Sequence, residues 1–213
     1  MQIFWHGFTC VRIEATHGDK QSTLITDPYD SSRGLRFPRT LHPDIVALSK
    51  DATKDFKLDA FTNKPFIIST PGEFEVQGIF VYGIPTTKQD EKDHGTIIYR
   101  FEAENISIGF IGEMHRALTE EEIERLGNID ILFLPVGGGT YMTTKQAVDT
   151  ISRVEPRMVI PLAHHVKGIK EKLGTADSFC KELVCKREDG NKLKIKKKDL
   201  PADELVVTVL ERA

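Results

Sequence analysis

Residues 130–161 carry the pattern that most limits how this chain can fold. The run "DILFLPV" (130–136) is apolar almost throughout, which is typical of a strand covered on both faces. A helix with one apolar face is predicted at about 143–154, and Pro156 ends it before the next strand, "RMVIP" (157–161). Two strands joined by a helix form a parallel pair in one sheet. The chain is therefore predicted to be an α/β protein.

The part of the chain before this unit adds antiparallel strands and one more helix. Short apolar runs and alternating patterns predict several strands, and "TIIYRFEAENISIGFI" (96–111) is typical of a hairpin around a Glu-Asn turn. Thr119 and Glu122 have the spacing of a capping box, which predicts the start of a helix. Gly127 stands where that helix is expected to end.

The C-terminal part, residues 166–213, is predicted to contain a helix near 175–186 and two strands, at 192–197 and 204–210. No low-complexity linker or internal repeat divides the sequence. We therefore expect a single domain over residues 1–213 with a mixture of parallel and antiparallel strands.

Charge and hydropathy exclude several classes of partner. The net charge is -3 and the pI is near 6.2, which gives no electrostatic reason to expect a nucleic-acid partner. The lysines of "KLKIKKK" (192–198) alternate with Leu193 and Ile195, as on the solvated face of a strand. No apolar run approaches the ~18 residues of a spanning helix, and no basic-then-apolar leader opens the sequence. A cytoplasmic protein without a membrane partner is expected.

The three cysteines are an odd number and show no paired spacing. They are Cys10, Cys180 and Cys185. This pattern favours a reducing compartment over a disulfide framework. Cys10 lies in an alternating segment and is predicted to be a core residue.

Several segments resemble a known family. "IFWHGFTCVRIE" (3–14), "LITDPYD" (24–30) and "DIVALSKDATKDF" (44–56) resemble the start of a metallo-β-lactamase-fold protein, and the block 112–161 extends the resemblance to about residue 165. The chain is similar to the branch of zinc-dependent hydrolases that includes L-ascorbate-6-phosphate lactonase. This resemblance implies a four-layer αββα sandwich, with a metal site on loops at one edge of the two sheets.

The same comparison shows other residues at the metal-ligand positions. In the family, metal ligands come from a loop with the motif Ser/Thr-His-x-His-x-Asp-His. A bridging Asp and two more histidines follow later in the family's sequences. Aligned on Ser49, the loop positions are Lys50, Ala52, Lys54 and Asp55, and the later positions are Lys88 or Gln89, Glu113, and Ala163 or, with a shift of one residue, His164. The family's Gly-His pair near the N-terminus is Gly7-Phe8 here, with the histidine displaced to His6.

Coordination chemistry indicates what these replacements mean. Zinc needs three or four imidazole, thiolate or carboxylate ligands, whereas an ammonium group repels a dication and alanine offers no lone pair. We therefore expect no metal cofactor. Carboxylates left without a metal would need another cation. The expected cations are Lys50, Lys54 and Lys88, and the carboxylates are Asp27, Asp55 and Glu113. The alternative is that these lysines simply lie in solvent.

Three functions remain open at this point. The first is a non-catalytic member of the family that has a small-molecule ligand in the old cleft and is free to form a homo-oligomer. The second is a hydrolase of lactones or phosphoesters with a non-standard zinc site. Its ligands would come from Asp27, Asp51, Asp55, Glu113, His115 and His164, with Asp27, Glu113, His115 and His164 as the most plausible set. The third is a metal-independent enzyme that uses a lysine as base or nucleophile.

Overall fold

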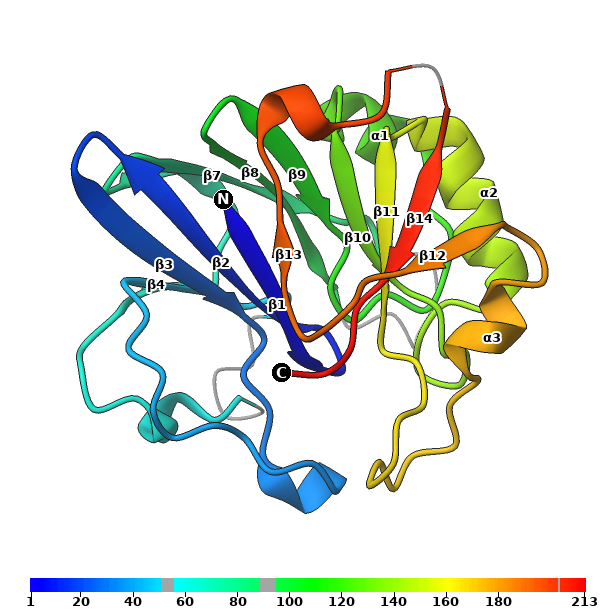
Figure 1. Ribbon diagram of the computed structural model, residues 1–213, viewed down its shortest axis with the longest axis horizontal. Helices are drawn as coiled ribbons and strands as arrows, with labels where there is room; N and C mark the ends of the chain where they lie inside the picture. The colour runs from blue at the N-terminus through cyan, green and yellow to red at the C-terminus, as the bar shows by residue number, and fades with distance from the viewer. Residues whose placement is uncertain (51–55, 89–94, 203) are drawn as a thin grey trace.

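Two β-sheets face each other in the computed structural model, which describes residues 1–50, 56–88, 95–202 and 204–213 (Figure 1). The first sheet has the strand order β13-β1-β2-β3-β4-β5. Its strands are β1 (Gln2–Gly7), β2 (Cys10–His17), β3 (Lys20–Thr26), β4 (Ile45–Ala47), β5 (Phe66–Ile68) and β13 (Leu193–Lys194). Strands β1 to β3 are antiparallel, and β4 and β5 continue the sheet in parallel.

The second sheet has the strand order β12-β14-β11-β10-β9-β8-β7-β6. Its strands are β6 (Gly72–Val76), β7 (Ile79–Pro85), β8 (Ile97–Ala103), β9 (Ile106–Phe110), β10 (Ile131–Pro135), β11 (Met158–Leu162), β12 (Cys185–Arg187) and β14 (Val206–Val209). Strands β6 to β9 pair antiparallel, and all pairs from β9 to β12 across the sheet are parallel.

The strand-helix-strand unit that the sequence predicts is confirmed. Strands β10 and β11 pair in parallel, and α2 (Thr144–Val154) connects them. The capping box is also present, because the Thr119 side chain accepts a hydrogen bond from the backbone of Glu122 at the start of α1 (Glu120–Leu126). Gly127 ends α1 with a positive φ of 69°.

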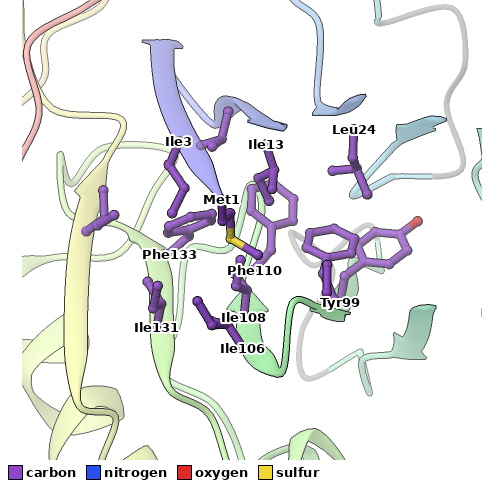
Figure 2. Packing of buried hydrophobic residues seen from close by; sticks show 14 of the residues in the cluster. Met1, Ile3, Ile13, Leu24, Tyr99, Ile106, Ile108, Phe110, Ile131 and Phe133 are labelled. Carbon is purple, nitrogen blue, oxygen red and sulfur yellow. The ribbon is translucent and has the colours of Figure 1, made fainter. Parts of the chain in front are cut away.

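The largest apolar cluster lies between the two sheets. Alternate residues of each strand point inward, so that Ile3, Ile13 and Leu24 of the first sheet meet Phe110 and Phe133 of the second (Figure 2). Burial of such side chains stabilises the fold by roughly 1.5–3 kcal/mol each.

Each sheet also has a covered outer face. Helices α1, α2 and α3 (Ala176–Phe179) pack on the outer face of the second sheet, where Leu126, Ile151 and Phe179 are buried (Figure 1). The segments 28–43 and 56–61 cover the outer face of the first sheet, and their regular structure is limited to short 3-10 turns such as Ser31–Arg33. The layers follow the order of the predicted αββα sandwich, with loops and 3-10 turns as the outer layer on the first sheet.

The C-terminal part differs from its prediction. The helix expected at 175–186 is only the four residues of α3, and the chain then turns into β12. Pairing of β12 with β14 outweighs the helical periodicity of this segment. The two strands that follow belong to different sheets, because β13 pairs with β1, whereas β14 lies between β11 and β12.

The prediction that the cysteines form no disulfide is wrong. Cys180 ends α3 and Cys185 begins β12, and the turn between them brings their Cα atoms to 5.5 Å, where a disulfide joins them. A close approach created by a turn leaves no recognisable spacing in the sequence. Cys10 is free and buried, as predicted. No helix in the described ranges is both long and apolar enough to cross a membrane.

Candidate functional site

The site lies where strands of both sheets end. Asp27 follows β3, Ser49 follows β4 and Glu113 follows β9, so the topology brings three separate segments to one edge of the sandwich. Asp27 is buried and has a positive φ of 38°. Its carboxylate accepts hydrogen bonds from the backbone N–H of Ser49 at 2.7 Å and from Ser49 Oγ at 2.8 Å.

Ser49 links Asp27 to Glu113. Its Oγ also accepts a hydrogen bond from the backbone N–H of Glu113 at 3.2 Å. Gly112 makes this contact feasible, because its φ is 65° and a Cβ there would lie 2.2 Å from the Ser49 Cβ. Burial of the Asp27 carboxyl raises its pKa to about 7, with a further contribution from the charge of Glu113, and the hydrogen bonds from Ser49 act in the opposite direction.

Glu113 is held by two cations and a phenol. Lys50 Nζ lies 2.5 Å from Glu113 Oε2, and Arg33 Nη1 lies 3.0 Å from Oε1. The Tyr141 hydroxyl lies 3.4 Å from the same Oε1 and accepts a hydrogen bond of 2.5 Å from Arg33 Nη2. Burial opposes ionisation of Glu113, but Lys50 and Arg33 outweigh it and hold the pKa of Glu113 below its usual value.

Arg33 connects the cluster to two further groups. Its Nε donates to Glu171 at 2.7 Å, and its guanidinium lies over the ring of Phe8, with 3.9 Å between the Cζ atom and the ring centroid. The resemblance places Phe8 at the position of the family's Gly-His histidine. By that alignment, a phenylalanine ring with the Arg33 cation stacked on it stands where the family has an imidazole.

The structure brings together only part of the predicted set. Lys50 and Glu113 form the expected kind of contact, and Asp27 joins them through Ser49. Lys88 is exposed, and the ion pairs between described residues do not include one from Lys88 to Asp27 or Glu113. The remaining predicted positions fall outside the described residues. These are Asp51, Ala52, Lys54, Asp55 and Gln89.

Ala163 and the histidines near the predicted ligand positions lie in different parts of the structure. Ala163 is buried with a positive φ of 52°, and its N–H bonds the carbonyl of Phe8 at 2.9 Å. His164 is buried against Trp5, with 4.3 Å between the ring centroids, whereas His165 is exposed. His6 is buried on the first sheet. Neither ring nitrogen of His6 or His164 has a hydrogen-bond partner among the described residues.

The donor chemistry of this edge does not fit zinc. Both oxygens of Glu113 already accept bonds from Lys50, Arg33 and Tyr141, and both oxygens of Asp27 accept from Ser49. The set of Asp27, Glu113, His115 and His164 does not form a metal-binding group, since the part of the chain that the structure describes has no cluster of three or more His, Cys, Asp or Glu side chains with that arrangement. Among the described residues these four therefore do not form the predicted set, and the zinc alternative stays a prediction.

Sequence reasoning missed Arg33, Tyr141 and Glu171. Arg33 belongs to a 3-10 turn that Asp30 caps, and Tyr141 follows the glycines of "VGGGT". Neither segment has a periodicity or spacing that points to Glu113. The sequence carries a weak signal for Arg33, because a buried carboxylate without a metal requires cations, and an arginine can supply the charge as well as a lysine.

The comparisons with known proteins agree with the fold. Residues 2–163 match the β-lactamase superfamily domain. The chain belongs to the β-lactamase superfamily. It shares 25% identity over 207 residues with a UPF0173 protein of Pyrococcus abyssi, which covers 88% of this chain and 92% of the relative. It shares 24% identity over 198 residues with a UPF0173 metal-dependent hydrolase of Anoxybacillus flavithermus, which covers 78% of this chain and 86% of the relative.

A solved structure supports the same family assignment. A metallo-β-lactamase-superfamily protein of Thermotoga maritima, regarded as a zinc-dependent hydrolase, superposes with a TM-score of 0.80 at 26% identity and covers 99% of both chains. The metallo-β-lactamase fold is thus established for this chain, within a family that contains metal-dependent hydrolases. The finer likeness to L-ascorbate-6-phosphate lactonase stays a prediction.

Proposed function

We propose that this chain is a non-catalytic member of the superfamily, in which ion pairs centred on Glu113 replace the metal site. The observation that carries the proposal is the position of Lys50 Nζ, 2.5 Å from Glu113 Oε2. The resemblance places Glu113 at the position of the family's bridging Asp, so the ammonium group would stand beside the carboxylate that holds the metal in the family. The proposed role is that of a pseudo-hydrolase that binds a small molecule at this edge.

The size of the electrostatic penalty supports this proposal. A dication about 4 Å from one unit positive charge is repelled by about 8 kcal/mol at an effective dielectric constant of about 20. Lys50 and Arg33 both contact Glu113, so a metal bound there would meet two such repulsions. Structural zinc sites gain about 10–16 kcal/mol from all of their ligands together. The repulsion from Lys50 and Arg33 therefore opposes that gain.

Zinc titration tests the absence of a metal site. Protein prepared without a nickel column and stripped with a chelator is titrated with zinc by calorimetry, and the Glu113→Ala variant is titrated in parallel. We expect no stoichiometric binding with a Kd below about 1 μM. Binding of that strength which Glu113→Ala abolishes would overturn the proposal in favour of the zinc-dependent hydrolase that the relatives' names suggest.

Activity assays separate the remaining alternatives. Lactone and phosphodiester substrates are offered with and without zinc, and we expect no turnover above buffer in either case.

An amine-selective reagent tests the lysine-based alternative by comparing Lys50 with Lys88, which is exposed and serves as the matched control. Labelling of Lys50 much faster than Lys88, with a steep pH dependence, would favour the lysine-based enzyme instead. A thermal-shift screen of metabolites tests the ligand.

A further inference from the structure

An apolar groove lies at the edge of the molecule opposite to the Glu113 cluster. Its hollow of about 400 Å³ runs between the second half of α2 and the segments that lead into β11 and β14. Ile151, Pro156, Leu183 and Leu205 supply its apolar walls. The strands β11, β14 and β12 are parallel, so the groove lies where they begin, and the Glu113 site lies at the edge where the strands end (Figure 1).

The polar groups of the groove are not arranged to orient a small ligand. Arg157 is already engaged, because its Nε donates to the Pro201 carbonyl at 2.5 Å and its Nη2 to the Leu200 carbonyl at 3.2 Å. Glu155 and Glu204 are exposed on the rim. A small-molecule pocket normally has convergent polar groups inside an apolar wall. This groove has an apolar floor and an acidic rim, which is typical of a surface that receives an apolar side chain.

A protruding apolar side chain stands next to the groove. Val184 is 92% exposed, the highest value among the large hydrophobic residues that the structure describes. It follows Leu183, which lines the groove, and it lies in the turn that the Cys180–Cys185 disulfide closes. The bridge restricts this turn, so Val184 can be buried by a partner at a small entropic cost.

We propose that two copies of this chain associate through this edge, with Val184 of each copy in the groove of the other. A two-fold contact needs a surface that is complementary to itself, and a protruding residue beside a groove meets that requirement. The charges agree. Lys181 and Lys186 flank Val184 and are exposed, so each can face the acidic rim of the opposite groove.

Within residues 181–186, the two exposed lysines outnumber the single acidic residue, Glu182. Arg187 is paired with Asp177 within its own chain, which leaves Glu182 as the exposed acidic group of the turn. The remaining exposed large hydrophobics, Phe66, Ile67 and Phe80, belong to β5 and β7, far from this groove in the strand order. Glu75 on β6 lies opposite Phe80 on β7 and would repel the Glu75 of a second copy in a two-fold contact there.

Sedimentation velocity over a wide range of protein concentration tests the proposal. We expect the full chain to sediment as a dimer, and Val184→Glu and Leu205→Glu each to raise the dimer Kd about 100-fold, since every dimer buries two copies of each residue. Phe80→Glu, a change at an exposed apolar residue outside the groove, is the matched control and should leave the Kd unchanged. Circular dichroism shows whether each variant is folded.

A charge-reversal pair adds a test that a folding defect cannot imitate. Lys186→Glu and Glu204→Lys should each weaken the dimer, and the double variant should recover most of the wild-type Kd. A monomeric wild type at every concentration would overturn the proposal, and so would a dimer that Val184→Glu leaves intact. A monomer that takes up an apolar dye in a Leu205-dependent manner would assign the groove to a small ligand instead.

Discussion

At the scale of single residues, Glu113 shows how a buried carboxylate is satisfied without a metal. Its side chain is 14% exposed and contacts Lys50 and Arg33, which are 28% and 27% exposed. The pair is therefore intermediate between a fully buried ion pair, where loss of one partner costs about 3–5 kcal/mol, and a surface pair, which contributes about 1 kcal/mol or less. Tyr141 adds a neutral donor to the same carboxylate oxygen as Arg33.

Replacement of Lys50 by Met tests how much this ion pair stabilises the fold. We expect Lys50→Met to lower the free energy of unfolding by about 1–2 kcal/mol, because Arg33 still neutralises part of the charge of Glu113. Urea denaturation with an unchanged m-value is the measurement. Lys88→Met, at an exposed position, is the control and should change stability by less than about 0.5 kcal/mol. Equal effects of the two changes would contradict the role given to Lys50.

The buried histidines predict a loss of stability in acid. Burial lowers the pKa of His164 from 6.5 to about 4, so between these values the unfolded chain binds a proton that the folded chain does not. Stability is therefore lost as pH falls from 6.5 to 4. His6 has the same shift. Asp27, with its pKa raised to about 7, acts in the opposite direction over much of this range.

The His164→Phe variant isolates one of these contributions. Phenylalanine keeps a ring against Trp5 but cannot titrate. We expect the variant to lose less stability than the wild type between pH 6.5 and pH 4, by up to about 3 kcal/mol. Urea denaturation across this pH range provides the comparison, with His165→Phe, at an exposed position, as the control. Parallel curves for wild type and His164→Phe would show that His164 does not titrate in this way.

At the scale of elements, the sequence predicts a helix or strand correctly where its local pattern agrees with the tertiary structure. It fails where pairing with a distant strand overrides the local pattern. The prediction of α2 between β10 and β11 holds because an apolar helical face and Pro156 agree with each other. The segment 175–186 has helical periodicity, yet β12 forms there because β14 offers an edge to pair with. The pairing of β12 depends on a strand whose paired residues lie 22 positions further along the chain, which no local pattern reveals.

The Cys180–Cys185 disulfide gives a prediction at the same scale. It closes a short loop, and the chain-entropy relation gives about 2 kcal/mol of stabilisation for a loop of this length. Reduction should therefore lower the free energy of unfolding by about that amount, measured in urea with and without reductant. The Cys180→Ser/Cys185→Ser double variant is the control, because reductant should not change its stability further. A wild type that does not respond to reductant would show that the bridge is absent or makes no contribution.

At the scale of the whole molecule, the fold was more predictable than the site. The residue patterns predicted one parallel unit among antiparallel strands, and the resemblance of residues 1–165 to the metallo-β-lactamase fold supplied the αββα architecture. The site was predictable at Lys50 and Glu113, which follow strands at aligned positions. Arg33 and Glu171 were not predictable, because they come from loops whose approach to Glu113 depends on the whole packed structure.

The C-terminal part tests whether residues 1–213 fold as one unit. Six residues after position 165 are buried in the two main clusters. Leu193, Ile195, Leu200 and Leu210 lie between the sheets, and Phe179 and Val207 lie under the helices. Loss of all six would remove about 9–18 kcal/mol of apolar burial, which is comparable to the whole stability of a typical domain, about 5–15 kcal/mol.

A chain that ends at residue 165 should therefore not fold. It would also lack β14, which pairs with β11, and β13, which pairs with β1, so each sheet would lose part of its edge. We expect this shortened chain to show no cooperative transition in thermal or urea unfolding followed by circular dichroism, whereas the full chain should show one. If the shortened chain unfolds cooperatively, with a midpoint near that of the full chain, residues 166–213 are an appendage and the single-domain prediction is wrong. Because β13 and β14 enter different sheets, we expect the loss to affect both sheets at once.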